Sequence, residues 1–446
     1  MNLNSREKSP SNAAPPVRNG DVEDGLGDPT EHSAREDQAD NDKWELKAPD
    51  GGMKAWLALL GSWCMLFCTF GLINAIGTFQ GYYEEVLLKN YSASTVAWIP
   101  SLQIFFAYFT NPFTGRLYDL YGPRYLVLVG SFLQVLGLMM TSLSTKYYQV
   151  LLAQGICTSI GMSAIYVPAT WFDKRRGMAY GIATSGSSVG GVILPIMISR
   201  LIPAAGFPWA MRSAAFLVLA LLIVANLTVA SRQPPNPKPV TRATLAAPFL
   251  DLKLMLINGG FLVLTFGVFI PINFLTVEAM SHGGGARFSS ELAHYLIATM
   301  NAGSLFGRIF SGIIADVAGA YNTFTSVSAL AGVLVLAFYI PATSVPAIFT
   351  FSVLFGFSSG AYIALIAPLI VKISPLDEAG YRIGLLFFLS SFSGLVTNPI
   401  GGAIVEQWHG DYTGMKIYSG VMLLGGTSIV FLSRMLATNW KLAVAF

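Results

Sequence analysis

From Pro49 to the C-terminus, the chain is a succession of apolar runs of about 20 residues separated by short polar segments. A helix of roughly that length crosses a lipid bilayer. Twelve such helices would use about 240–300 residues, and 397 of the 446 residues follow position 49. The chain therefore has room for twelve spans and their loops, with no large soluble domain besides.

We expect an all-α membrane protein with twelve transmembrane helices. Hydropathy places the spans near 55–79, 94–114, 125–143, 148–169, 178–200, 211–231, 257–279, 293–314, 322–341, 345–368, 382–404 and 414–436. Between the sixth and the seventh lies a polar segment rich in proline, which is typical of a linker. It predicts a six-helix half at 50–231, a cytosolic linker at 232–256 and a second six-helix half at 257–446.

Charge is sparse and unevenly distributed. Only 11% of the residues are charged, against about 25% in soluble proteins. Residues 1–49 carry six basic and eleven acidic groups and few apolar side chains, which predicts a disordered cytosolic tail. The basic excess of the remaining chain is too dispersed for a nucleic-acid site. The three cysteines lie in apolar runs and predict neither a disulfide framework nor a metal site.

The two predicted halves share a short motif. In the segment after the second span, Gly115, Asp119 and Gly122 occupy the same relative positions as Gly, Asp and Gly after the eighth, 197 residues later. That second copy contains Asp316. Two related six-helix halves are the architecture of many secondary transporters, which bind solute between the halves.

Lysine and arginine in the loops predict the orientation of the chain. If both termini are cytosolic, the inner segments after the first span hold thirteen basic residues and the outer segments hold six. Cytosolic loops carry the excess of positive charge. We therefore expect both termini in the cytosol and, as the most common location for such a carrier, the plasma membrane.

The segment from Gly115 to Arg124 resembles the loop motif of the major facilitator superfamily. Its glycines let helix ends approach closely, and Asp119 can accept hydrogen bonds from a helix N-terminus or pair with an arginine of the other half. We expect Gly115, Asp119, Gly122 and Arg124, with Asp316 of the second copy, to form a gate. The alternative is a tight polar turn capped by the aspartate.

Two further stretches resemble the signatures of the monocarboxylate transporter family, especially its fungal branch: Pro49 to Gly52 before the first span, and Trp171 to Gly190 around the start of the fifth. The resemblance covers about residues 49–436 and implies a proton-linked carrier of small organic anions. Two residues depart from the family pattern. Asn74 stands where transport-competent members have lysine, and Ser304 stands where they have aspartate, four residues before the matching Arg308.

The position of Arg308, well inside the eighth span, also indicates a functional role. A charge at such a depth is costly and usually faces a cavity or a partner. The planar guanidinium suits a carboxylate and does not lose its proton. We expect Arg308 to hold an anionic solute. The alternatives are snorkelling to the interface, or a structural ion pair with Asp119 or Asp316.

Several uncharged polar residues in the spans are candidates for contact with the solute, although bonds between helices are the more common role of such residues. They are Asn74, Asn273, Asn301, Tyr166 and Tyr362. Glu278 falls near a span end, where we expect it to be interfacial. Asn90 lies in a glycosylation sequon of the first outer loop, whereas the sequon at Asn226 is inside the sixth span. We therefore expect a glycan at Asn90 alone.

Together these patterns predict a secondary active or facilitative transporter that moves a small organic anion by alternating access. Export of a metabolite and proton coupling are both open. One alternative is a carrier of a neutral or larger solute such as a vitamin or specialised metabolite, and another is a non-transporting membrane sensor. We expect no enzyme, no cofactor and no metal, since no nucleophile or ligand constellation is present. The expected partners are the solute and the bilayer, and the expected state is a monomer.

Overall fold

The computed structural model describes residues 49–165, 171–231, 241–280, 290–442 and 444–446. The tail predicted for residues 1–49 lies outside these ranges except for Pro49, and so does Tyr166. The described residues form helices and connecting turns and include no strand.

We call residues 50–231 the first half and residues 257–446 the second half. The helices of the first half are α2 (Met53–Asn74), α3 (Ile76–Tyr82), η1 (Tyr83–Leu87), α4 (Ala93–Val96), α5 (Trp98–Phe109), α6 (Asn111–Tyr121), α7 (Pro123–Leu143), α8 (Tyr147–Val150), η2 (Leu151–Thr158), α9 (Ser159–Ala164), α10 (Arg176–Ala205) and α11 (Phe207–Thr228). The segments η1 and η2 are π-helical.

A short helix, α12 (Arg242–Leu250), follows in the predicted linker. The remaining helices are α13 (Leu252–Met280), α14 (Ser290–Ala318), α15 (Ala320–Val333), η3 (Leu334–Tyr339), α16 (Val345–Ile373), η4 (Leu376–Glu378), α17 (Ala379–Gln407) and α18 (Thr413–Ala437). Glycine and proline residues mark the boundaries between several consecutive helices. Gly122 and Gly206 have φ of 75° and 81°, and a proline at the start of α7 and of α11 suits the first turn of the next helix.

Every expected span overlaps one helix or a run of consecutive helices. Within the described residues, nine helices are long and apolar enough to cross a membrane. The expected second, fourth and eighth spans are not among them. The second is divided into α5 and α6, the fourth into α8, η2 and α9, and the eighth is the long helix α14 that contains Arg308. The number of twelve spans stays a prediction.

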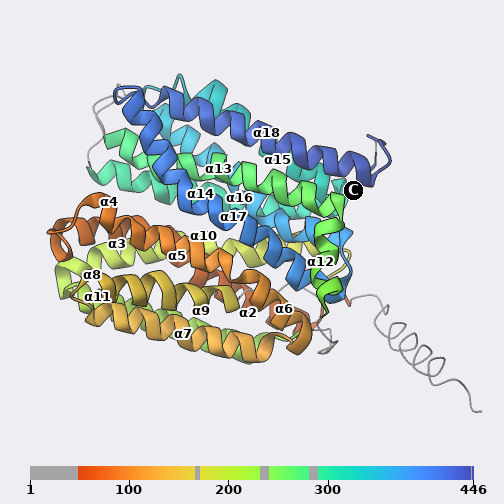
Figure 1. Cartoon of the computed structure of the whole chain (residues 1–446), viewed down its shortest axis with the longest axis horizontal. Helices are drawn as coiled ribbons and strands as arrows, with labels where there is room; N and C mark the ends of the chain where they lie inside the picture. The colour runs from red at the N-terminus through yellow and green to blue at the C-terminus, as the bar shows by residue number, and fades with distance from the viewer. Residues whose placement is uncertain (1–48, 166–170, 232–240, 281–289, 443) are drawn as a thin grey trace, which may run out of the picture. The chain divides into compact units, whose positions relative to one another are not determined.

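The helices pack mainly within their own half. In the first half α2 packs against α10 and α11, and α7 against α11; in the second, α13 packs against α18 and α14 against α16. Figure 1 shows the two groups one above the other. The contacts across the halves are chiefly those of α10 with α14 and of α17 with α5 and α6. Asp119 lies at the second of these seams, and Asp316 and Arg308 lie at the first.

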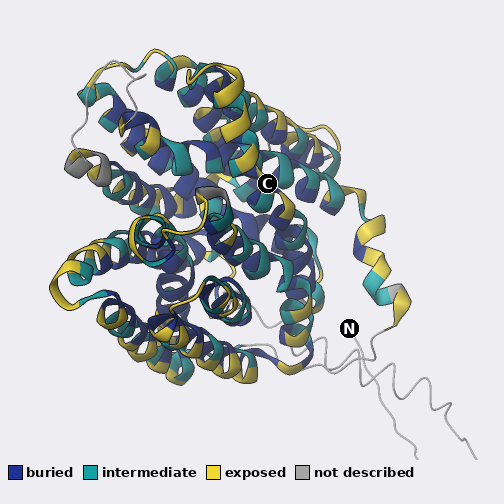
Figure 2. Ribbon diagram, turned by 60° about the vertical axis from the view of Figure 1, so that its left-hand side comes forward, coloured by how far each residue is buried: buried dark blue, intermediate teal, exposed yellow. Residues whose placement is uncertain are grey.

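Large apolar side chains cover the outward faces of the helices, where Figure 2 shows exposed residues facing away from the buried interior. On α7 and α11, for example, Phe132 is 65% exposed, Leu128 58% and Phe216 54%. Such surface is unfavourable in water and favourable against lipid tails. The helices therefore belong to an integral membrane protein.

Candidate functional site

The carboxyl group of Asp119 joins the two halves. Asp119 lies near the end of α6, and its two oxygens accept hydrogen bonds from the backbone amides of Gly380 (2.9 Å) and Tyr381 (2.8 Å) at the start of α17. The unpaired amides of a helix N-terminus attract a carboxylate. Burial raises the pKa of Asp119 to about 7, although the two amides and Arg116 act in the opposite direction.

Asp316 makes the equivalent contact on the other seam. It lies near the end of α14 and accepts from the amides of Gly177 (2.6 Å) and Met178 (2.9 Å) at the start of α10. Burial raises its pKa as well. We call these two contacts the latches, and the end of the protein where both lie the latch end. The motif repeated in the sequence thus makes the same contact twice, each time from one half to the other.

Both copies of the repeated motif need glycine, because the two halves approach each other closely at its first position. A Cβ on Gly115 would come within 2.1 Å of the carbonyl oxygen of Gly380, and one on Gly312 within 2.3 Å of that of Gly177. The last glycine of each copy, Gly122 or Gly319, has positive φ, 75° and 93° respectively. The side chain of Arg124 is exposed, and the arginine that interacts electrostatically with Asp119 is instead Arg116.

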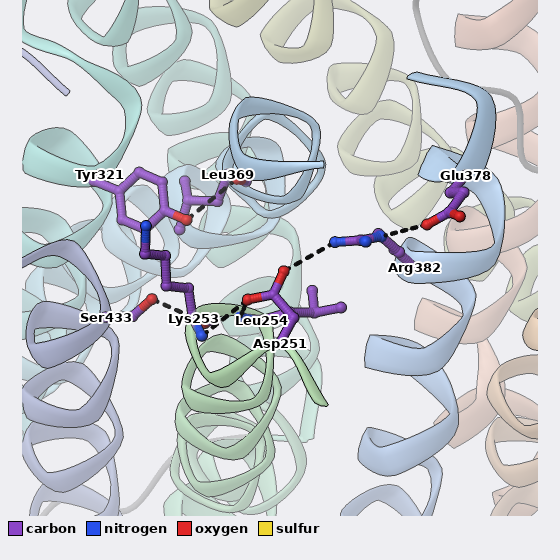
Figure 3. A network of polar contacts seen from close by, with 8 residues as sticks. All are labelled: Asp251, Lys253, Leu254, Tyr321, Leu369, Glu378, Arg382 and Ser433. Atoms are coloured by element: carbon purple, nitrogen blue, oxygen red, sulfur yellow. Dashed lines mark hydrogen bonds and ion pairs between the residues drawn. The ribbon is translucent and has the colours of Figure 1, made fainter. Parts of the chain in front are cut away.

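Two ion pairs of Arg382 also hold the start of α17. Arg382 donates to Asp251 and to Glu378, both at 3.0 Å, and Figure 3 shows the guanidinium between the two carboxylates. The hydroxyl of Tyr381 donates to the carbonyl of Leu245 in α12 (3.2 Å). The helix end that Asp119 contacts is therefore also tied to the linker helix.

The two stretches that resemble the monocarboxylate transporter family contact each other, which was not predicted from the sequence. One oxygen of Asp50 accepts from the amides of Asp173 (2.7 Å), Lys174 (2.9 Å) and Arg175 (3.4 Å), immediately before α10. The segment that begins α10 is thus held by Asp50 of its own half and by Asp316 of the other. Asp50 has φ of 50°, a conformation that aspartate tolerates better than most residues.

Arg308 is buried in the seam between α14 and α10, with 3% of its surface exposed. Its Nη1 donates to the carbonyl of Thr184 (2.5 Å) and to Ser187, and its Nε donates to Ser304 (3.1 Å). Among the described residues no carboxylate pairs with it, and none accepts from Nη2. The expected alternatives, snorkelling and a pair with Asp119 or Asp316, do not describe this environment. Neutral oxygens surround a buried cation.

Two of the other predicted polar residues meet across the halves. Asn74, at the end of α2, donates to Asn301 of α14 at 3.4 Å. Gly191 of α10 packs against both side chains, and a Cβ there would come within 2.7 Å of either. Asn301 and Arg308 are two turns apart on α14, so they face the same seam.

Two further predicted residues, Asn273 and Tyr362, bond within the second half. Asn273 donates to Asn398 of α17 at 2.7 Å. Tyr362 shares a hydrogen bond with Thr265 (3.2 Å) and stacks on Phe261. Asn90, the predicted glycan acceptor, is exposed in the turn between η1 and α4.

A cavity lies between the first half and α17. Its wall consists of Thr69, Phe70, Ile73, Ala107, Tyr108, Asn111, Met162, Ser163 and Phe387. Most of these side chains are apolar or aromatic, with a few hydroxyl and amide groups among them. The cavity is small, about 20 Å³, which is room for a water-sized molecule. No sequence pattern marks this wall, because its polar residues are scattered in otherwise apolar runs.

Glu278 was expected to be interfacial, and it lies two residues before the end of α13, in a buried ion pair. It is 9% exposed and lies 2.6 Å from Nζ of Lys416 at the start of α18. The hydroxyl of Tyr339 donates to its other oxygen (2.5 Å), and the ammonium group lies 4.1 Å from the centre of the Tyr339 ring. The ion pair lies within the second half, because α13 packs on α18 and brings the two side chains together.

The family model of the Major Facilitator Superfamily matches residues 58–342. The chain belongs to this superfamily. Among its relatives, the MFS transporter asaE of Aspergillus flavus is 51% identical over 405 residues, which cover 89% of this chain and 90% of the relative. The Fujikurins efflux protein of Gibberella fujikuroi is 46% identical over 403 residues, covering 89% and 86%. These relatives are transporters, a non-enzymatic class.

Solved structures of the superfamily have the same fold at low sequence identity. The fucose:proton symporter FucP of E. coli superimposes with a TM-score of 0.66 at 14% identity, covering 84% of this chain and 98% of its own. The human organic anion transporter MFSD10 superimposes with a TM-score of 0.65 at 15% identity, covering 85% and 100%. The all-helical major facilitator fold of this chain is thus shown.

Proposed function

We propose that this major facilitator protein exports a small organic anion, a specialised metabolite of the cell that makes it, by alternating access across the plasma membrane. The proposal includes twelve spans, cytosolic termini, a latch end that faces the cytosol, and a monomer as the working unit. Relatives that are 51% and 46% identical include one whose name describes efflux of the fujikurins. This supports export and a specialised metabolite as the solute.

The environment of Arg308 is the observation that supports an anionic solute. The family to which the sequence is similar has an aspartate at the position of Ser304, and here a serine hydroxyl accepts from Nε instead. A buried cation needs a counter-charge, since desolvation of an unpaired charge is costly. We infer that the solute supplies it, while Asn74 and Asn301 provide hydrogen bonds close by.

The latches supply the conformational part of the proposal. With Asp119 and Asp316 bound to helix N-termini of the opposite half, the halves are held together at the latch end. Release of both contacts would let the halves separate there and admit solute from the cytosol. Re-formation of both would commit the solute to the outer side. Gly115 and Gly122, with their counterparts around Asp316, permit the close approach that closure needs.

The experiment compares wild type with Arg308→Lys and Arg308→Ala in producing cells, at equal surface expression. Untargeted metabolomics of medium and cells first identifies the exported compound as the one whose external level depends on the protein. Arg308→Lys keeps the charge but loses the forked geometry, so export should fall; Arg308→Ala should be nearly inactive. The matched control is Arg212→Ala, which removes a cation that lies over the Trp209 ring in the first half.

A neutral or larger solute is the second candidate, and the largely apolar wall of the cavity favours it. The same variants distinguish the two. Export at the wild-type rate by both Arg308 variants would exclude the anion site and leave the neutral solute as the better proposal.

A further inference from the structure

Tyr108 has an environment that the sequence analysis did not predict. It lies on α5 and is 8% exposed, and it forms part of the cavity wall. Its hydroxyl makes no hydrogen bond with any described residue, although other buried tyrosines do. Tyr83 bonds to Gln154, and Tyr362 to Thr265. A phenol hydroxyl that is nearly buried normally has a partner.

Two of the residues expected at the site, Arg308 and Tyr362, lie within electrostatic range of Tyr108. The Nη2 atom of Arg308 likewise has no acceptor among the residues of the described ranges. Two hydrogen-bond donors without a described acceptor, one of them cationic, thus lie within electrostatic range of each other, and the phenol lines the cavity. An acidic group with two oxygens could satisfy both.

Aromatic rings surround the phenol. The ring of Tyr108 lies 5.2 Å from that of Phe387 on α17 and 6.2 Å from that of Phe70 on α2, centre to centre, and both neighbours also line the cavity. Phe387 comes from the second half, so the aromatic group spans the seam. Rings at such distances favour offset or edge contacts with a further planar system.

We propose that Tyr108 is a substrate-binding residue, and that the solute is an aromatic or conjugated acid. Its acidic group accepts from the hydroxyl of Tyr108 and from Arg308, and its planar body packs against Phe70 and Phe387 once separation of the halves widens the cavity. This inference rests on the proposed function and adds to it the residue that selects the solute and the chemical class selected. A short aliphatic carboxylate would satisfy the donors but leave the aromatic wall without a contact.

The test measures binding of 2-naphthoate to the purified full-length protein in detergent by isothermal titration calorimetry, with propanoate as the aliphatic comparison. Tyr108→Phe removes a single oxygen and keeps the ring, so it should fold; gel filtration and thermal unfolding check this. Tyr125→Phe is the matched control, since that tyrosine is 70% exposed on α7, away from the cavity. Arg308→Ala is measured in parallel.

We expect the wild type to bind 2-naphthoate at least tenfold more tightly than propanoate. Tyr108→Phe should weaken 2-naphthoate binding by about tenfold to a hundredfold, the effect of losing one hydrogen bond to a charged group, while Tyr125→Phe binds as the wild type does. No binding of 2-naphthoate by the wild type, or unchanged binding by Tyr108→Phe, would overturn the inference. If Arg308→Ala alone abolishes binding, the proposed anion site stands and the role of Tyr108 fails. If Arg308→Ala binds as the wild type does, the proposed anion site fails.

Discussion

Removing the carboxyl group of Asp119 should open the latch end. In Asp119→Ala the amides of Gly380 and Tyr381 lose their acceptor at a helix N-terminus. Loss of a capping side chain costs about 0.5–2 kcal/mol, and an unsatisfied buried donor costs about 1–3 kcal/mol. We therefore expect the latched state to lose about 1–3 kcal/mol relative to the open state, which changes their ratio about fivefold to 150-fold.

Spin labels on opposite sides of the seam can measure this ratio. Residues 125 on α7 and 372 on α16 are exposed at the latch end, one in each half. Among the native cysteines Cys64 and Cys68 are buried, and Cys157, which is partly exposed, would be replaced by serine. Double electron–electron resonance should then show a longer distance between the labels gaining population in Asp119→Ala.

The matched control is Asp411→Ala. Asp411 also accepts from a backbone amide at the start of a helix, that of Thr413 at 2.9 Å, but both residues belong to the second half. Its removal should leave the distance distribution unchanged. Equal distributions for Asp119→Ala and wild type would refute the view that Asp119 holds the halves together.

The same latch should respond to pH. Burial raises the pKa of Asp119 to about 7 in the latched state, against 3.8 for the ordinary group, whereas opening would return the carboxyl group to water. The latched state therefore binds the proton more tightly, so acid favours it. This stabilisation of the latched state is complete below about pH 3.8. It falls by about 1.4 kcal/mol per pH unit above that value and is lost as the pH rises through about 7. Open protein should thus be more abundant at pH 7.5 than at pH 5.5, and Asp119→Asn should remove most of this dependence. If open protein is instead more abundant at pH 5.5 in the wild type, protonation of Asp119 does not favour the latched state.

Three further predictions concern the rest of the chain. Lys416→Met leaves the buried carboxylate of Glu278 without its cation, so stability should fall by about 3–5 kcal/mol, seen as a lower midpoint of thermal unfolding in detergent; an unchanged midpoint would contradict a stabilising pair. In a eukaryotic host only Asn90 should carry a glycan, because Asn226 is engaged on α11 with Ser131 (2.9 Å); a glycan on Asn226 in mass spectrometry would overturn the predicted topology. Deletion of residues 1–40, which lie outside the family resemblance, should leave transport by reconstituted protein intact, and loss of transport would show that the tail belongs to the carrier.

The sequence by itself predicted the class of protein and most of its helices. Apolar runs of bilayer length determine helices locally, because in lipid each backbone group must find its partner within the same segment. Gly122 and Gly206, each followed within two residues by proline, mark helix boundaries for an equally local reason. The repeated motif also indicated that Asp119 could accept from a helix N-terminus, since that property belongs to the aspartate and not to its surroundings.

Only the tertiary structure decided which helix each aspartate meets. Asp119 contacts an amide 261 residues away and Asp316 one 139 residues away, and nothing in the local pattern specifies a pairing over such a distance. The same holds for Glu278, which became a buried ion pair because α13 packs on α18. Tyr108 was one aromatic residue among many in an apolar run. Its place beside Phe387 exists only because α5 and α17 pack against each other across the two halves, and that packing joins segments distant in sequence.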